Sequence, residues 1–159
     1  MRPADFARAG DLSAKALFEV KRAAKAKLLA RVRRSLERSF LERSDSPRLL
    51  HAMLDGLDEN ALYVGFARRF APYKRAQLLL EDVERLAALL TNEDRPLRFL
   101  VAGKAHPKDL AGQALVQQMV EIGRDPELAG RIVFLEDYDM SLARDLVSGV
   151  DVWLNTPTR

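Results

Sequence analysis

Residues 61–75 read Ala-Leu-Tyr-Val-Gly-Phe-Ala-Arg-Arg-Phe-Ala-Pro-Tyr-Lys-Arg, an apolar run that ends in a cluster of basic residues. The apolar part, 61–67, carries aromatic and β-branched side chains and is typical of a buried strand. A helical pattern follows over residues 73–90, and Pro72 suits its first position. Loop amides, the positive end of a helix dipole and cationic side chains all attract anions. We therefore expect this turn to bind a phosphate group.

The same alternation continues along the rest of the chain. Three more short apolar runs occur at 97–103, 131–136 and 150–155, and helical patterns lie between them at 109–124 and 140–148. Strands that alternate with helices are typical of βαβ units, and near-continuously apolar strands indicate a parallel sheet covered on both faces. We predict an α/β fold with a Rossmann-like parallel sheet, in which the fourth strand lies beside the first.

Ligands of such sheets bind beyond the carboxyl ends of the strands. In this chain those ends carry Arg68, Arg69, Lys104, Asp137, Tyr138, Asn155 and Thr156. Arg69 on the strand-exit loop and Lys74 in the first helical turn can approach one phosphate from two sides. The alternative is that Arg68, Arg69 and Arg75 only form surface ion pairs, and their position at a strand end favours the phosphate site. No Gly-x-Gly-x-x-Gly or Walker-type loop occurs, which argues against a dinucleotide or P-loop site.

Residues 11–43 are predicted to form one long helix with Asp11 or Ser13 as its N-cap, and a short helix follows from Pro47 to Gly56. The long segment holds ten Lys and Arg against four Asp and Glu, whereas residues 44–159 are mildly acidic. Its charge could bind nucleic acid, or its apolar stripe could pack on a neighbouring element with the charges in solvent. We favour packing, because few aromatic residues interleave with the charges. The chain then divides into a helical arm or linker, 1–58, and an incomplete Rossmann-like half-domain, 59–159.

Composition excludes several kinds of chemistry. The chain has no cysteine, so disulfides, thiolate metal sites and cysteine nucleophiles are absent. Its two histidines do not have metal-ligand spacing, and no Ser/His/Asp arrangement can be assembled. No apolar run approaches the ~20 residues of a membrane span, so we expect a cytoplasmic protein without a membrane partner.

The last predicted strand, residues 150–155, is apolar, and the chain ends four residues after Asn155. An apolar strand at an open sheet edge favours pairing with another strand. We therefore expect the sheet to be cut partway through, the chain to be a fragment of a longer protein, and the exposed edge to offer a route to self-association.

Several motifs together resemble one known family, the α-glucan (glycogen/maltodextrin) phosphorylases, and most closely its bacterial and archaeal branch. They are Gly65-Phe-Ala-Arg-Arg-Phe-Ala-Pro-Tyr-Lys-Arg75, Ala102-Gly-Lys-Ala-His-Pro107, Phe134-Leu-Glu-Asp-Tyr-Asp-Met-Ser-Leu-Ala143 and Gly149-Val-Asp-Val-Trp-Leu-Asn-Thr-Pro157. The resemblance is strong over residues 60–159 and weak over the N-terminal helix.

The resemblance implies a GT-B architecture, of which this chain is the first half of the C-terminal domain. It implies phosphorolysis of α-1,4-glucan to glucose 1-phosphate with pyridoxal 5′-phosphate. By the motif, Arg69 and Lys74 hold the substrate phosphate and Arg68 approaches the cofactor phosphate, while Lys104, Tyr138 and Asn155 lie at the edge of the site. Animal-type members have Lys in place of Arg68 and His-Glu in place of Ala71-Pro72, which leaves the charge pattern intact.

In the family, the Thr-Pro segment continues into a Glu-Ala-Ser-Gly-Thr-x-x-Met-Lys stretch whose lysine forms the cofactor Schiff base, and Arg159 ends this chain before it. We therefore expect the chain to be inactive without the remainder of the enzyme. Two alternatives stay open. One is a segment of a nucleotide-sugar glycosyltransferase of the glycogen-synthase kind, which uses the same Arg and Lys on a diphosphate. The other is a non-catalytic module that binds nucleic acid through Lys21–Arg38.

Overall fold

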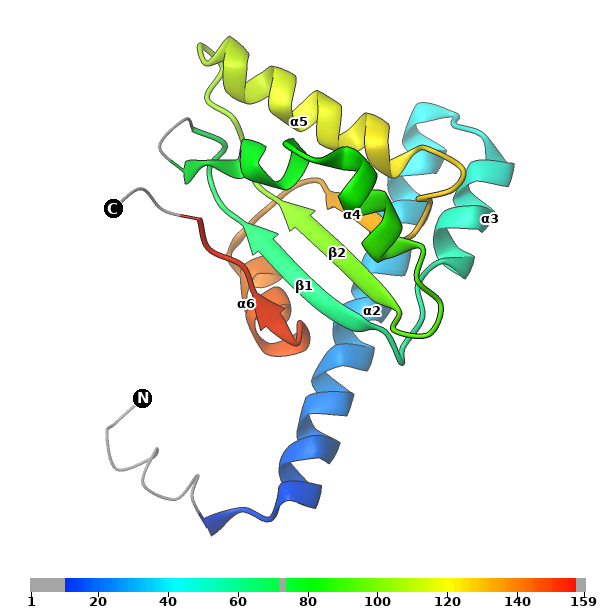
Figure 1. Cartoon of the computed structure of the whole chain (residues 1–159), viewed down its shortest axis with the longest axis vertical. Coiled ribbons are helices and arrows are strands. Elements are labelled where there is room, and N and C mark those ends of the chain that lie inside the picture. Colours follow the sequence, from blue (N-terminus) through cyan, green and yellow to red (C-terminus); the bar gives the residue numbers. More distant parts are fainter. Residues whose placement is uncertain (1–10, 72–73, 157–159) are drawn as a thin grey trace.

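A parallel sheet of four strands runs through the middle of the structure (Figure 1). The structure is a computed structural model that describes residues 11–71 and 74–156. The strands are β1 (Leu62–Ala67), β2 (Leu97–Ala102), β3 (Ile132–Leu135) and β4 (Val152–Trp153), and they lie in the order β3-β2-β1-β4. All three pairings are parallel. The α/β class and the position of the fourth strand beside the first are confirmed.

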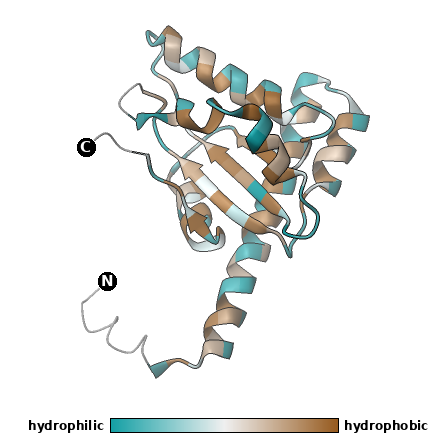
Figure 2. Ribbon diagram, in the orientation of Figure 1, coloured by the Kyte–Doolittle hydropathy of each residue, from teal (hydrophilic) through white to brown (hydrophobic). Residues whose placement is uncertain are grey.

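Helices cover both faces of the sheet, because successive strand residues point to opposite sides and both sets are apolar. Tyr63, Leu100 and Val133 belong to one buried cluster, which also contains residues of α2 (Ala14–Arg43), α3 (Pro47–Asp55) and α6 (Met140–Gly149). Phe66, Val101 and Ile132 belong to the other, under η3 (Ala76–Leu80), α4 (Val83–Leu90) and α5 (Leu110–Gly123). The hydrophobic colour of β1 and β2 in Figure 2 reflects this double burial.

Helix α2 begins where a capping residue was expected, since the Ser13 side chain accepts a hydrogen bond from the Ala16 N–H at 3.2 Å. Its apolar stripe, however, is buried only in the C-terminal half, from Leu28 to Phe40. Leu17 and Val20 remain 47% and 68% exposed, because the first turns of the helix extend beyond the sheet (Figure 1). The prediction that the whole stripe packs was therefore wrong for this half. Close packing starts near Gly149, where a Cβ would lie 2.6 Å from the Leu28 Cβ.

The basic face of α2 is used inside the molecule. Lys21 Nζ donates to the carbonyls of Ser148 and Val150 at the C-terminal end of α6, where the helix dipole favours a cation. Lys25 Nζ lies 2.7 Å from Asp151 Oδ2. The Arg33 guanidinium donates to the Leu54 carbonyl in the last turn of α3 and to the Leu57 carbonyl just after this helix. Much of the positive charge of this helix therefore serves to dock it onto the mildly acidic remainder of the chain.

Strand β4 is shorter than the predicted run 150–155. The Asp151 side chain accepts a hydrogen bond from the Tyr63 N–H at 2.9 Å, and only Val152 and Trp153 form ladder pairs with β1. Both side chains are about two-fifths exposed. The expectation of an apolar strand at an open edge of the sheet is thus confirmed in a short form.

Tyr63 offers a test of the core. Its side chain is fully buried, and among the described residues its hydroxyl has no hydrogen-bond partner. Burial also raises the pKa of this phenol. Because an unpaired buried hydroxyl costs about 1–3 kcal/mol, we expect Tyr63→Phe to leave the free energy of unfolding unchanged or to raise it. Tyr63→Ala, which removes the ring, should lower it by about 3–5 kcal/mol. Urea unfolding measures both, and a clear loss of stability in Tyr63→Phe would contradict the unpaired hydroxyl.

The junction between α2 and α5 predicts a dependence of stability on pH. Arg124 at the end of α5 donates two hydrogen bonds, of 2.7 and 2.5 Å, to the Asp45 carboxylate. These hydrogen bonds lower the pKa of Asp45 to about 2. A folded pKa below the unfolded one, about 3.9, contributes stability above pH 4 that is lost as the pH falls towards 2. We expect the free energy of unfolding to fall less steeply over this range in Asp45→Asn. Asp55→Asn, which removes an exposed carboxylate, is the control, and equal slopes for all three proteins would contradict the assignment.

Candidate functional site

The basic loop, residues 68–75, leaves β1 between the carboxyl ends of β2 and β4. On the β2 side its backbone is hydrogen-bonded to the neighbouring strand exit. The Arg68 N–H donates to the Ala102 carbonyl, and the Phe70 N–H donates to the Lys104 carbonyl, both at 3.1 Å. Gly103 lies so close beneath the loop that a Cβ there would meet the Arg68 carbonyl oxygen at 1.9 Å. The exits of β1 and β2 are therefore held against each other.

On the β4 side two consecutive polar residues contact the basic loop. The Arg68 guanidinium donates to Asn155 Oδ1. The Thr156 hydroxyl donates to the Lys74 carbonyl at 2.8 Å and lies 3.3 Å from the Arg75 carbonyl. The structure thus brings together the predicted site residues Arg68, Lys74 and Asn155, from segments more than 80 residues apart in the chain.

The cationic side chains of this edge differ in exposure. Arg69, Arg75 and Lys104 are exposed, and in residues 11–71 and 74–156 none of their side chains has a hydrogen bond or an ion pair. Arg68 and Lys74 are half-buried. Three side chains with uncompensated positive charge at one sheet edge are suited to a multiply charged anion. The alternative, in which Arg69 and Arg75 pair with surface carboxylates, is not observed in the described part of the chain.

The predicted helix 73–90 is wrong in its first half. The Lys74 N–H donates to the Ala71 carbonyl in a single turn, Arg75 then takes a left-handed conformation with φ 51°, and η3 follows. The α-helix α4 begins only at Val83, where the Asp82 side chain caps the Arg85 N–H at 2.9 Å. A left-handed residue breaks the helix, so in the described residues no α-helix starts directly after the loop. Pro72, which we expected at the first position of this helix, lies outside the described ranges.

Tyr138 does not join this group. It follows β3, at the opposite end of the sheet from β4, and packs against the cluster formed with α2, α3 and α6. Its neighbour Asp139 accepts a hydrogen bond from the Leu142 N–H at 2.6 Å and caps α6. The strand order explains the separation, because two strands lie between β3 and β4.

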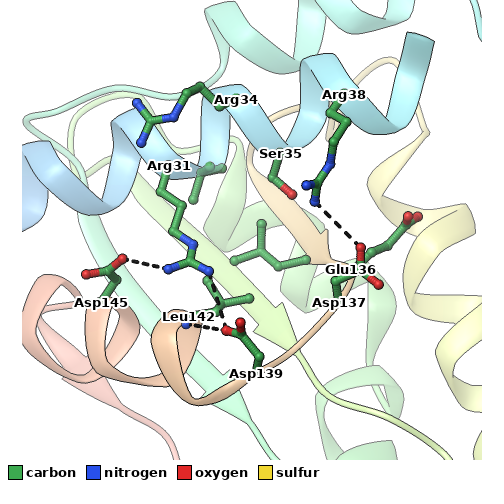
Figure 3. A pocket seen from close by; sticks show the side chains of 11 residues that line it. Arg31, Arg34, Ser35, Arg38, Glu136, Asp137, Asp139, Leu142 and Asp145 are labelled. Carbon is green, nitrogen blue, oxygen red and sulfur yellow. Dashed lines mark hydrogen bonds and ion pairs between the residues drawn. The ribbon is translucent and has the colours of Figure 1, made fainter. Parts of the chain in front are cut away.

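A hollow of about 580 Å³ lies between α2 and the exit of β3 (Figure 3). Sequence reasoning did not identify it. It is lined by alternating charges, with Arg31 Nη1 at 2.9 Å from Asp145 and Arg38 Nη2 at 3.6 Å from Asp137. Hydrogen bonds from Lys27 and Arg31 lower the pKa of Asp145. Since these guanidinium groups already have carboxylate partners, we interpret the hollow as part of the contact between α2 and α6.

No helix in the described ranges is long and apolar enough to cross a membrane. No protein-family model matches the chain. In sequence it is 48% identical over 132 residues to a glycogen phosphorylase of Mycobacterium tuberculosis (strain CDC 1551 / Oshkosh), covering 83% of this chain and 15% of that protein. It is 47% identical over 125 residues to a maltodextrin phosphorylase of Thermococcus litoralis, covering 78% and 15%. A glycogen phosphorylase of Aquifex aeolicus is 48% identical over 124 residues, covering 78% and 18%.

Among solved structures, the C-terminal domain of a glycosyl transferase group 1 family protein (LpcC) from Francisella tularensis overlaps 58% of this chain and 44% of its own, with a TM-score of 0.42 and 22% identity. The chain spans less than a fifth of the length of the three relatives above, and it is homologous to them over about four fifths of its own length.

Proposed function

From its homology to the glycogen and maltodextrin phosphorylases, we propose that this chain is the phosphate-binding segment of a cytoplasmic α-glucan phosphorylase. The observation that carries the proposal is Arg69 at the carboxyl end of β1, exposed and without a side-chain partner in the described part of the chain, within a sequence 48% identical to a glycogen phosphorylase. The parent enzyme would cleave α-1,4-glucan with phosphate to give glucose 1-phosphate. In its GT-B architecture, residues 1–58 would form a helical arm and residues 59–159 would form the first half of the C-terminal domain.

In this proposal Arg69 and Lys74 hold the substrate phosphate next to the glycosidic bond. Two cations on one phosphate orient its attacking oxygen and stabilise charge as the bond breaks and an oxocarbenium-like sugar forms. Lys104, exposed at the exit of β2, adds positive potential at the edge of the same site. The chain would supply positioning and electrostatics, and the remainder of the enzyme would supply the sugar site. The open edge at Val152 and Trp153 is where another strand would pair.

The cofactor proposed for the parent enzyme is pyridoxal 5′-phosphate, and the residues of this chain fit its phosphate end. Arg68 is half-buried, and its guanidinium donates to the neutral oxygen of Asn155, so no carboxylate in the described part of the chain compensates its positive charge. Such a group is suited to a phosphate ester. When bound, the cofactor would supply a phosphate group to the site, and Arg68 would hold that group and neutralise part of its charge.

Two rival functions are less well supported. A nucleotide-sugar glycosyltransferase could use Arg69 and Lys74 on a diphosphate, but the relatives above carry the name phosphorylase. A nucleic-acid-binding module would need a free basic face on α2. Four basic residues of this helix instead make contacts within the chain. Lys21 and Arg31 contact α6. Lys25 contacts Asp151 just before β4, and Arg33 contacts the chain between α3 and β1.

The test uses the full-length protein that contains this chain, incubated with α-1,4-glucan and inorganic phosphate. We expect glucose 1-phosphate to form and the protein to show the near-visible absorbance of an internal aldimine. Parallel reactions contain a nucleoside diphosphate glucose in place of phosphate. Glucan extension from the nucleotide sugar, without that absorbance and without glucose 1-phosphate, would overturn the proposal in favour of the synthase-like rival.

A further inference from the structure

Two consecutive residues shortly after β4 contact the basic loop at both of its ends. Asn155 contacts Arg68 at the beginning of the loop, and Thr156 contacts Lys74 and Arg75 at its end. In the proposed function, Lys74 binds the substrate phosphate and Arg68 binds the cofactor phosphate. Resting on that function, we propose that Asn155 and Thr156 are positioning residues for phosphate, which set the geometry of the basic loop without touching the ligand themselves.

The end of the loop needs such support because its backbone is strained. Arg75 has φ 51° and ψ 37°, a left-handed conformation that non-glycine residues adopt only when their surroundings hold them. Helix propagation, which would satisfy the Lys74 carbonyl further along the chain, is interrupted at this residue, whereas the Arg75 carbonyl accepts a hydrogen bond from the Leu78 N–H at 3.1 Å. The half-buried Thr156 hydroxyl donates to the Lys74 carbonyl at 2.8 Å and lies near the Arg75 carbonyl. This hydrogen bond fixes the turn from which the Lys74 side chain extends.

At the beginning of the loop the chemistry of Asn155 is specific. Its side-chain oxygen accepts one N–H of the Arg68 guanidinium and carries no charge. It therefore orients Arg68 while it leaves the positive charge and the other N–H groups available to a phosphate. An aspartate at this position would orient Arg68 equally well but would neutralise it. Asn155 and Thr156 are adjacent in sequence, so a shift of one would also move the other contact.

Kinetic measurements on the full-length protein test the inference with Thr156→Val, which removes the hydroxyl and keeps the branched shape. We expect the KM for inorganic phosphate to rise about tenfold, the value of one lost hydrogen bond, with the KM for glucan unchanged. Thr156→Ser should restore the wild-type value. Thr91→Val is the matched control, because the Thr91 hydroxyl also donates to a backbone carbonyl, at 2.9 Å, and Thr91 lies in the chain that leads from α4 to the amino end of β2.

Asn155→Asp gives the second measurement, and we expect it to weaken phosphate binding at least as much as Asn155→Ala because it also cancels the charge of Arg68. Calorimetry of inorganic phosphate binding distinguishes a failure of the proposed function from a failure of the positioning role alone. A wild-type protein that neither binds phosphate nor releases glucose 1-phosphate would overturn the proposed function together with this inference. A wild-type protein that binds phosphate, with Thr156→Val and Asn155→Asp binding it within twofold, would overturn the positioning role alone.

Discussion

Gly103→Ala is expected to destabilise the chain by about 3 kcal/mol or more, through backbone strain and a direct clash. Gly103 has φ 150°, a conformation that side-chain-bearing residues rarely adopt. A Cβ at this position would lie 1.9 Å from the Arg68 carbonyl oxygen and 2.9 Å from the Phe70 ring. Neither the oxygen nor the ring can move freely, because the Arg68 and Phe70 N–H groups are bonded to the exit of β2. The substitution must therefore separate the exits of β1 and β2.

Urea unfolding of the wild type, Gly103→Ala and Lys104→Ala measures this effect. Lys104 is exposed, and its side chain has no partner in the described part of the chain, so its replacement should change the free energy of unfolding by no more than about 0.5 kcal/mol. The comparison separates the backbone clash from the loss of a neighbouring charge. Equal stability of Gly103→Ala and the wild type would show that the two strand exits are not in close contact.

The sheet could be predicted from sequence because its signal is local. Each of these strands buries both faces, so the runs at 61–67, 97–103 and 131–136 are mostly apolar, and the helices between them fix parallel pairing. The order β3-β2-β1-β4 then follows from right-handed crossovers. The start of the last strand was less predictable, since Asp151, just before β4, accepts the Tyr63 N–H with its side chain.

The candidate site was predictable in its residues and less so in its geometry. The basic cluster at the end of β1 is visible in the sequence, but the left-handed Arg75 is not, because nothing in an Ala-Gln-Leu-Leu-Leu run after it argues against a helix. The separation of Tyr138 from Asn155 depends on the strand order and on packing against α2. The conformation of Arg75 and the position of Tyr138 both depend on tertiary contacts between distant segments, which local sequence patterns do not reveal.

The largest effect on activity is expected from Arg69 in the full-length protein, where Arg69→Ala should lower kcat/KM for phosphorolysis by about 10²-fold. Arg69 is exposed, and its side chain has no partner in the described part of the chain, so its charge stabilises no contact there. A guanidinium holds a phosphate with two parallel hydrogen bonds, and Arg69→Lys, which keeps the charge and loses this fork, should recover only part of the activity. Lys74→Ala should act on the same step, and its effect should not add fully to that of Arg69→Ala, because both hold one phosphate.

Arg95→Ala is the matched control for these variants. Arg95 is an exposed arginine just before the amino end of β2, whereas the basic loop lies at the carboxyl ends of the strands, so its replacement makes the same change in net charge away from the proposed site. Initial rates of glucose 1-phosphate formation against phosphate concentration give the comparison. We expect the Arg69 variants to change kcat/KM for phosphate strongly and the free energy of unfolding by less than about 0.5 kcal/mol, because the side chain is exposed. An Arg69→Ala enzyme with the phosphate dependence of Arg95→Ala would remove Arg69 from the site, since a general loss of positive charge would then account for both.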